Sequence, residues 1–278
     1  MNFQVSFEDE IVVFPHGEAG YNCTRIPSIL TTSAGTLLAF GEARMFSCSD
    51  YTQTDIVYKR SLDNGKTWSN LQKWVALGPP GGLLLQSNRI LIPGDYSTNS
   101  NVISGSSSTG FVMLNDFNGQ IDKWYLGGEI NLHNYYPNEG QAVELLPNAN
   151  SIFINSRSHT TKRIGAYSNN GGITFNKVKV LNTLVQPLHG CEGSTIYHKN
   201  TGQLFYTGLA EISTTRTNLS LHMSHDNGEH WTYIKTICPG SSGYSSMTIL
   251  NDQSIGLLYE KGSIMGGPAS LTLTIIYN

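Results

Sequence analysis

A short phrase that recurs along the chain constrains the fold more than any other feature of the sequence. Residues 61–68 read SLDNGKTW, residues 224–231 read SHDNGEHW, and residues 168–175 read SNNGGITF. The shared pattern is Ser-x-Asp/Asn-x-Gly-x-x-aromatic, and a degraded copy with a longer loop, LNDFNGQIDKW, lies at residues 114–124. The copies begin 53, 54 and 56 residues apart. This near-constant period indicates a repeat architecture with one supersecondary unit per period.

The phrase itself predicts a turn between two antiparallel strands. Gly and Asn tolerate the positive φ that tight hairpins need. The Ser and Asp/Asn side chains are able to hydrogen-bond the backbone of the turn, and we expect the final aromatic ring to pack under the next sheet edge. Asp63 and Asp226 are therefore expected to be structural and not catalytic.

Strand-like segments fill the intervals between the copies. Most have four to eight residues, are rich in β-branched and aromatic types, and are bounded by Gly, Asn, Ser or Pro, as in DIVYKRS, NLSLHMS and LTLTIIY. No stretch shows a sustained helical period. About four strands in each period predict an all-β fold, a β-propeller of four-stranded antiparallel blades, as a single domain over residues 1–278.

Charge and hydropathy argue against several classes of partner. The net charge is −3 and no Lys/Arg run exceeds two residues, so the chain lacks the basic surface that nucleic acid requires. No apolar run reaches the roughly 18 residues of a transmembrane segment. The opening MNFQVSFEDE has acids where a secretion signal has a basic flank, so we expect a cytoplasmic protein.

The four cysteines are Cys23, Cys48, Cys191 and Cys238. They are widely separated in the sequence, with no CxxC and no His at metal-ligand spacing. Buried thiols are the favoured interpretation, and a disulfide or metal site is the alternative.

Three arginines have the distribution expected for a site at the mouth of a propeller. Blade loops and strand ends gather there, so site residues recur at roughly blade spacing, as Arg25, Arg157 and Arg216 do. A guanidinium fork matches a carboxylate in a bidentate manner, so the three are candidates to bind one anion. From the residues alone, ordinary salt bridges at blade edges are the stronger alternative.

Several motifs, in order, resemble those of the sialidase (exo-α-neuraminidase) family. YNCTRIPSI resembles the Arg-Ile-Pro motif, and the recurring phrase resembles the sialidase Asp box. NEGQAVEL followed by INSRSHTTKRIGAYS resembles the segment that carries a Glu and then an Arg, and HGCEGS, TTRTNLSL, GYSSM and LLYEKG are similar to later landmarks. The resemblance runs from about residue 20 to residue 262 and is closest to the animal cytosolic-type branch.

The resemblance implies an exo-α-sialidase that hydrolyses terminal sialic acid from glycoconjugates with retention. Arg25, Arg157 and Arg216 match the triad that binds the substrate carboxylate. A carboxylate nucleophile would meet that same anion, and sialidases use a Tyr instead. Tyr244 in GYSSM matches this nucleophile, and Glu139 in NEGQ matches the residue that pairs with it.

The resemblance also assigns the supporting residues. Asp50 in CSDYTQTD matches the acid/base, with Asp55 as the rival assignment. Glu260 in LLYE matches the carboxylate that braces Arg25, and Arg44 in GEAR resembles a site arginine that helps the clamp or contacts the acetamido group.

His189 and Glu192 in HGCEGS are either site residues or ordinary loop residues, and the sequence leaves this open. The chemistry requires no metal or organic cofactor. The expected partners are sialylated glycans of glycoproteins, gangliosides and oligosaccharides. Two alternatives are a lectin-like, sialic-acid-binding propeller and a trans-sialidase or anhydro-product variant.

The sequence departs from the family in its length. Sialidase catalytic domains are six-bladed, whereas this chain gives five repeat units: the four phrase copies and a last unit, about residues 236–278, that pairs with the N-terminal strand EIVVF. The gap falls just after Trp68 and removes none of the assigned residues. We expect a five-bladed ring.

Overall fold

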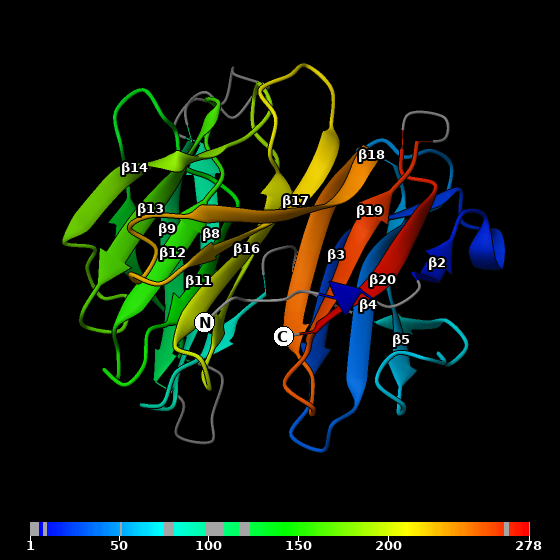
Figure 1. Ribbon diagram of the computed structural model, residues 1–278, viewed down its shortest axis with the longest axis horizontal. Helices are drawn as coiled ribbons and strands as arrows, with labels where there is room; N and C mark the ends of the chain where they lie inside the picture. The colour runs from blue at the N-terminus through cyan, green and yellow to red at the C-terminus, as the bar shows by residue number, and fades with distance from the viewer. Residues whose placement is uncertain are drawn as a thin grey trace. The chain divides into compact units, whose positions relative to one another are not determined.

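The computed structural model describes residues 6–7, 10–50, 52–74, 81–97, 108–116, 123–263 and 267–277. Strands dominate this part of the chain, with one short 3-10 helix, η1 (Glu18–Gly20). The chain divides into two compact units, and Figure 1 traces their strands in order along the chain.

The first unit comprises Met1–Gly78, Thr217–Leu219 and Ile237–Asn278. One sheet has four antiparallel strands in chain order: β3 (Cys23–Thr31), β4 (Leu37–Arg44), β5 (Thr54–Ser61) and β6 (Gln72–Trp74). The other strands of this unit are the end of β18 (Thr232–Ile249), then β19 (Ile255–Lys261) and β20 (Ser270–Tyr277), with β1 (Ser6–Phe7) and β2 (Ile11–Pro15) paired to β20.

The pairing of the N-terminal strand with the last repeat unit is confirmed. β2 runs antiparallel to β20, with Ile11 opposite Leu273 and Phe14 opposite Leu271. The two sheets of the first unit are also linked by hydrogen bonds. Ile29 N donates to Ser246 Oγ at 3.0 Å, and Thr31 Oγ1 donates to the Ile249 carbonyl at 2.7 Å. β3, β18 and β19 are therefore held together within one unit.

The second unit comprises Pro79–Arg216 and Ser220–Thr236. Its first sheet contains β7 (Leu83–Leu84), β8 (Arg89–Ser97), β9 (Ser108–Asp116) and β10 (Tyr125–Ile130). Its second contains β11 (Gly140–Glu144), β12 (Ile152–Ser156), β13 (Lys162–Ser168) and β14 (Lys177–Val185). The remaining strands are β15 (Ser194–His198), β16 (Gln203–Leu209), β17 (Thr217–Ser224) from Ser220 onward, and the start of β18. The predicted all-β fold is confirmed, and three sheets of the described residues have the expected four antiparallel strands. The five-bladed ring and the single domain remain predictions.

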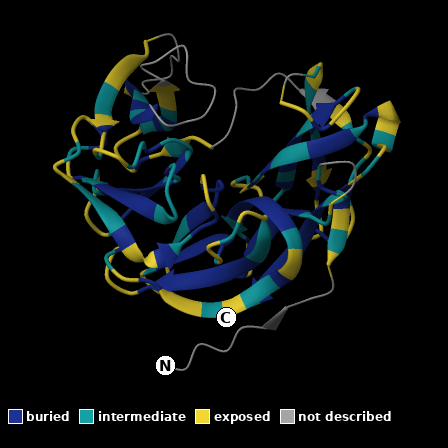
Figure 2. Cartoon of the chain, turned by 90° about the horizontal axis from the view of Figure 1, so that it is seen from above, coloured by how far each residue is buried: buried dark blue, intermediate teal, exposed yellow. Residues whose placement is uncertain are grey.

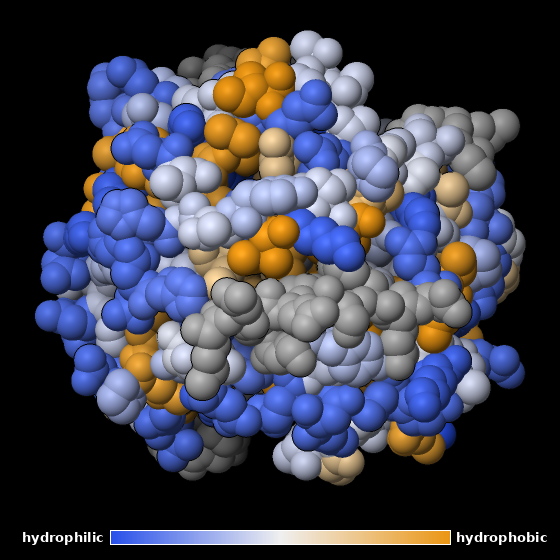
Figure 3. All heavy atoms as spheres, in the orientation of Figure 1, coloured by the Kyte–Doolittle hydropathy of each residue, from blue (hydrophilic) through white to orange (hydrophobic). Residues whose placement is uncertain are grey.

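Each unit has its own apolar core between sheets. Buried residues follow the strands, whereas exposed residues gather at the turns (Figure 2). The first core includes Val13, Phe14, Ala39, Val57, Leu258 and Leu271. The two cores of the second unit include Leu91, Val112, Ile152 and Ile154, and Phe153, Leu204, Tyr206 and Trp231. On the face shown in Figure 3, apolar residues form small groups separated by hydrophilic ones.

The recurring phrase forms the predicted turn. Ser61 Oγ donates to Asp63 Oδ1 at 2.7 Å and accepts from Gly65 N at 2.8 Å. Asp63 also accepts from Thr67 N at 2.9 Å and from Thr67 Oγ1 at 2.6 Å. Gly65 has a φ of 89°, and Trp68 Nε1 donates to the Gly65 carbonyl at 2.9 Å. The structural interpretation of Asp63 is confirmed, because both of its carboxylate oxygens accept hydrogen bonds from residues of the same turn.

The other complete copies take the same place in their sheets. The turns at residues 61–68, 168–175 and 224–231 each join the third strand of a sheet to the fourth. Asn170 replaces Asp and keeps the bonds, accepting from Thr174 N at 3.0 Å and donating to Thr174 Oγ1 at 2.9 Å. Much of the degraded copy, residues 117–122, lies outside the described residues.

Replacing Asp63 by Asn is expected to leave the turn intact near neutral pH. It should also make the stability of the protein less sensitive to acid. Hydrogen bonds from Thr67, and then from Ser61, lower the pKa of Asp63 from 3.8 to about 2. Because the pKa in the folded state lies below the unfolded value, the carboxylate contributes stability above pH 3.8 that is lost as the pH falls through about 2. The Asn variant lacks this contribution, and Asn170 shows that the turn accepts Asn.

The measurement is the urea midpoint of unfolding for both proteins, followed from about pH 5 to about pH 2. The wild-type midpoint should fall more steeply than that of Asp63→Asn. Equal slopes would contradict the assignment of acid sensitivity to this carboxylate.

Candidate active site

Arg25 projects from a β-bulge on β3. The bulge interrupts the pairing of β3 with β4 between Arg25 and Ser28, and bulges re-aim the side chains beside them. Ile26 has a φ of 56°, which is unfavourable for a β-branched residue. Its N–H donates to Glu260 Oε1 at 3.2 Å, which holds the strained backbone in place. The Arg-Ile-Pro motif therefore encodes a local distortion that directs Arg25 out of the regular strand.

Glu260 on β19 joins three parts of this site. Its side chain is 4% exposed, and Oε1 accepts from Arg25 Nε at 3.0 Å. Its Oε2 accepts from the backbone N–H of Tyr244 at 3.0 Å. Burial disfavours the charged form of Arg25, but Glu260, Tyr244 and Asp50 together outweigh it, and the pKa of Arg25 is raised. The contact expected between Glu260 and Arg25 is present.

Tyr244 on β18 lies against the Arg25 guanidinium. The Arg25 Cζ is 5.5 Å from the ring centroid, within the range of a cation–π interaction. The residue is buried, with 6% of its surface exposed. Gly243 precedes it, and a Cβ at Gly243 would lie 2.1 Å from Glu260 Oε2, so a larger residue there would push the carboxylate away.

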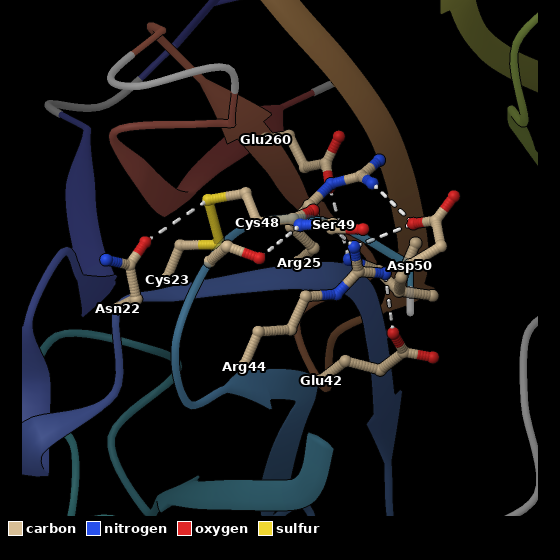
Figure 4. The surroundings of a disulfide bond; sticks show 11 residues. Asn22, Cys23, Arg25, Glu42, Arg44, Cys48, Ser49, Asp50 and Glu260 are labelled. Atoms are coloured by element: carbon tan, nitrogen blue, oxygen red, sulfur yellow. Dashed lines mark hydrogen bonds and ion pairs between the residues drawn. A yellow bond between two sulfur atoms is a disulfide. The ribbon is translucent and has the colours of Figure 1, made fainter. Parts of the chain in front are cut away.

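Asp50 lies on the loop between β4 and β5. Its Oδ1 accepts from Arg25 Nη1 at 3.1 Å and from Arg44 Nη1 at 2.7 Å, and its side chain is 70% exposed (Figure 4). The rival, Asp55, lies on β5, where its carboxylate accepts from the Tyr21 hydroxyl at 2.5 Å. Of the two candidates, the structure places Asp50 against Arg25.

Arg44 ends β4 and is almost fully buried, with 3% of its side chain exposed. Its Nη1 donates to the Cys48 carbonyl at 2.6 Å as well as to Asp50, and its Nη2 donates to Glu42 Oε2 at 2.8 Å. Glu42 was not selected from the sequence. It sits two residues before Arg44 on the same strand, and this spacing places both side chains on one face of β4.

Cys23 and Cys48 form a disulfide, so the interpretation of all four cysteines as thiols was wrong for this pair. Separation along the chain was misleading, because the pairing of β3 with β4 places Cys23 opposite Arg44, close to Cys48. Their Cα atoms are 5.8 Å apart, within the usual disulfide range. The bond joins the start of the Arg25 strand to the Asp50 loop (Figure 4). Cys191 and Cys238 are buried thiols, as predicted.

The second unit contains a separate cluster around Arg157. Its Nη1 donates to Glu139 Oε2 at 2.7 Å, and its Nε and Nη2 donate to the His189 carbonyl at 3.1 and 2.8 Å. His189 has a φ of 65°. A Cβ at Gly190 would lie 2.5 Å from the Ser158 carbonyl and 2.8 Å from Arg157 Cγ. The HGCEGS loop therefore orients Arg157 through a backbone carbonyl.

Buried polar residues that the sequence did not single out support this cluster. Arg163 is fully buried and donates to Asn155 Oδ1 and to the Cys191 carbonyl, both at 2.7 Å. Gln186 donates to the carbonyls of Ser158 and Thr160 at 3.1 and 2.8 Å. These bonds tie the segment after Arg157 to the loop that carries His189.

Glu192, in the same loop, is buried with 6% exposed. Arg216 is half-buried immediately before β17. Arg216 and Arg157 belong to the second unit and Arg25 to the first, so a shared arginine triad stays a prediction.

The described residues offer neither a ready metal site nor a membrane-spanning helix. No group of three or more His, Cys, Asp or Glu side chains in this part of the chain is arranged to hold a metal ion. No helix in the described ranges is long and apolar enough to cross a membrane.

Comparison with known proteins places the chain in a family. The model of the BNR repeat-like domain matches residues 11–259. Sialidase-2 of Cricetulus griseus is 26% identical over 242 residues, which cover 76% of this chain and 62% of that protein. The chain thus spans about 60% of the length of the curated sialidase-2 relatives.

Solved sialidase structures share the fold. A Hadza microbial sialidase superposes with a TM-score of 0.70 at 18% identity, covering 96% of this chain and 68% of that one. Trypanosoma rangeli sialidase in complex with 2,3-difluorosialic acid, described as a covalent intermediate, gives a TM-score of 0.71 at 15% identity and covers 96% and 58%. The chain therefore belongs to the family of BNR repeat-like domains and is a relative of the sialidases, with which it shares a β-propeller-like fold.

Proposed function

We propose that this protein is an exo-α-sialidase that releases terminal sialic acid from glycoconjugates with retention, through a covalent tyrosyl intermediate. One arrangement carries the proposal: a single buried carboxylate, Glu260, holds both the Arg25 side chain and the Tyr244 backbone, while Asp50 lies on the same guanidinium. A clamp arginine, a phenol and a carboxylic acid/base candidate thus occupy one small region of the first unit.

The substrate explains why these groups are combined. Sialic acid carries a carboxylate on its anomeric carbon, and this anion binds to guanidinium groups: Arg25, with Arg157 and Arg216 as the proposed partners. A neutral phenol approaches an anionic centre with less repulsion than a carboxylate would meet. A phenol in water has a pKa near 10, so attack by a tyrosine at neutral pH requires a base, and Glu139 is proposed for that role on the strength of its NEGQ motif.

The proposed reaction has two steps. In the first, Tyr244 Oη bonds to the anomeric carbon and the glycosidic bond breaks; Glu139 takes the phenol proton and Asp50 gives a proton to the departing oxygen. In the second, Asp50 removes a proton from water, the water oxygen bonds to the anomeric carbon, and the tyrosyl bond breaks. The phenol recovers its proton from Glu139. Two displacements at one carbon retain its configuration.

Purified protein should release the fluorophore from an aryl α-sialoside, and proton NMR should show α-sialic acid as the first product. Incubation with 2,3-difluorosialic acid should add one sugar to the intact mass, mapped to the peptide that contains Tyr244. Asp50→Asn is the matched variant and should lose about 10²-fold or more in kcat/KM with a glycosyl leaving group.

Other outcomes would identify one of the alternative functions or contradict the covalent step. Binding of sialic acid with no release would establish the lectin-like alternative. Transfer to an added galactoside would identify a trans-sialidase, and an anhydro sugar as the first product would identify the intramolecular variant. Release without a mass adduct on the Tyr244 peptide would contradict the covalent step.

A further inference from the structure

The disulfide between Cys23 and Cys48 lies between two residues of the proposed site. Cys23 precedes Arg25 by two residues on β3. Cys48 precedes Asp50 by two residues on the loop between β4 and β5. Two residues of extended chain span roughly 7 Å at most, so each site residue lies close to one end of the bridge. A covalent path through the two sulfur atoms therefore connects the backbone of Arg25 to the backbone of Asp50 (Figure 4).

Two hydrogen bonds within the loop that carries Asp50 are long. Ser49 N donates to Ser47 Oγ at 3.3 Å, and Thr52 N donates to the Ser49 carbonyl at 3.4 Å. Bonds of this kind in proteins are usually about 2.9 to 3.0 Å long, and they weaken as they lengthen. The covalent bond at Cys48 restrains the same segment far more strongly than these contacts do.

The bridge is packed inside the first unit. Cys23 is 1% exposed and Cys48 is 8% exposed. The backbone of Gly267, in the segment before β20, lies directly against the sulfur atoms, because a Cβ added there would overlap Cys48 Sγ and lie 3.5 Å from Cys23 Sγ. Cys48 is therefore fixed against two other segments of the unit, the start of β3 and the segment before β20.

We propose that the Cys23–Cys48 disulfide positions Asp50 for proton transfer to the leaving group, and that opening this bond slows the cleavage of substrates whose leaving group needs that proton. This inference rests on the proposed sialidase function. The bridge acts through the backbone of the loop and not by touching the sugar. The two cysteines are therefore positioning residues, whereas Asp50 is the residue that exchanges the proton.

The contact with Arg25 is not sufficient to place Asp50 during the proposed reaction. Asp50 is 70% exposed, and its Oδ1 lies 3.1 Å from Arg25 Nη1. The substrate carboxylate would take donors of Arg25, so it competes with Asp50 for the same guanidinium. A disulfide on the loop backbone is not subject to this competition. It keeps Asp50 within hydrogen-bond reach of the glycosidic oxygen while the contact with Arg25 is weakened.

Opening the bridge should affect different leaving groups unequally. A glycosyl leaving group needs a proton from Asp50 as the bond breaks, whereas an aryl leaving group is acidic and departs with little help. Partial unfolding would instead lower both rates by the same factor, because unfolded molecules cleave neither substrate. The ratio of the two rates therefore separates a positioning role from a role in stability.

The test uses Cys48→Ser in the full chain, with kcat/KM measured on sialyllactose and on an aryl α-sialoside. We expect about a 20-fold loss on sialyllactose and less than about a 3-fold loss on the aryl sialoside. The inhibition constant of free sialic acid should change by less than about 3-fold, because Glu260 still holds Arg25 at 3.0 Å.

Reduction of the wild type gives the same comparison without a substitution, which keeps the test decisive if Cys48→Ser does not fold. Dithiothreitol breaks the S–S bond by thiol–disulfide exchange; it is oxidised to its cyclic disulfide, and Cys23 and Cys48 each gain a proton and become thiols. The thiols alkylated in denaturant should rise from the two free cysteines to all four. If the folded protein resists the reagent, Cys23→Ser opens the bond from its other end and should give the same rate ratio.

Two further variants locate the effect. In an Asp50→Asn background, Cys48→Ser should cause no additional loss that is specific to sialyllactose, because no acid remains to be positioned. Cys238→Ser makes the same chemical change at a buried free cysteine of the first unit, 6% exposed, and should leave both rates unchanged.

The outcomes separate this inference from the proposed function. An active wild type whose Cys48→Ser variant loses both substrates equally would overturn the positioning role and leave the sialidase proposal standing. So would a further loss specific to sialyllactose in the Asp50→Asn background. A wild type that cleaves neither substrate would overturn both.

Discussion

Replacing Tyr244 by Phe is expected to lower kcat/KM on any sialoside by about 10³-fold or more, with little change in the affinity for sialic acid. The substitution removes only the phenol oxygen. The ring stays on β18, so its packing beneath Arg25 at 5.5 Å and the bond from its N–H to Glu260 are kept. The proposed nucleophile is lost, while Arg25, the proposed anion-binding group, keeps its support.

The measurements are turnover of the fluorogenic sialoside and calorimetric binding of sialic acid. Tyr259→Phe is the matched control, because Tyr259 is also a buried tyrosine of the first unit and its hydroxyl donates to Glu10. It should retain turnover. Full activity in Tyr244→Phe would refute the assignment of the nucleophile, and loss of sialic acid binding would show that the hydroxyl serves the ground state.

Local patterns in the sequence predicted the turns well, because each turn is determined by a few adjacent residues. Ser61, Asp63 and Gly65 lie within one phrase, and the hydrogen bonds of the Ser61 and Asp63 side chains run to residues of that phrase. The antiparallel pairing of β2 with β20 followed from repeat counting, since the last unit needed another strand. Period and turn chemistry were sufficient for these features.

The supporting contacts of the site were not predictable in the same way. Cys23 meets Cys48, and Glu42 supports Asp50 through Arg44, because of strand register and a loop conformation that no local pattern records. In the second unit, His189 contributes a backbone carbonyl to Arg157, so the identity of its side chain carried no signal. Motif resemblance selects the proposed reacting groups but not the residues that contact them.

Glu260→Ala is expected to cost about 3 to 5 kcal/mol of unfolding free energy and to remove sialidase activity as well. The carboxylate is 4% exposed and Arg25 is 14% exposed, so deletion removes the buried partner of a largely buried guanidinium and leaves it the exposed Asp50. It also removes the acceptor of Ile26 N–H, which lies in a strained conformation, and of Tyr244 N–H. One deletion therefore loosens Arg25 and the strand that carries Tyr244, the proposed nucleophile, together.

Glu260→Gln refines this expectation. Gln keeps the volume but has one oxygen, whereas Glu260 uses both oxygens as acceptors: Oε1 for Arg25 and Ile26, and Oε2 for Tyr244. In either orientation its amide N–H₂ group faces a donor, leaving at least one buried N–H unsatisfied at about 1 to 3 kcal/mol. The Gln variant should thus lie between wild type and Ala in urea unfolding.

Asp116→Ala on β9 tests whether the burial of the carboxylate or the length of its bond to arginine controls the loss of unfolding free energy. Asp116 Oδ1 accepts from Arg89 Nε at 2.6 Å, shorter than the 3.0 Å bond between Glu260 and Arg25, but its side chain is 59% exposed. Arg89 is 15% exposed, close to the 14% of Arg25, but its Nη1 also donates to the carbonyls of Asn170 and Gly171. Water also reaches the position that the exposed Asp116 carboxylate vacates, so Asp116→Ala should cost less than Glu260→Ala despite the shorter bond. If the two Ala variants lose equal stability, burial of the Glu260 carboxylate is not what holds Arg25 and Tyr244 in place. Other contacts must then place Arg25 beside Tyr244, as the proposed chemistry requires.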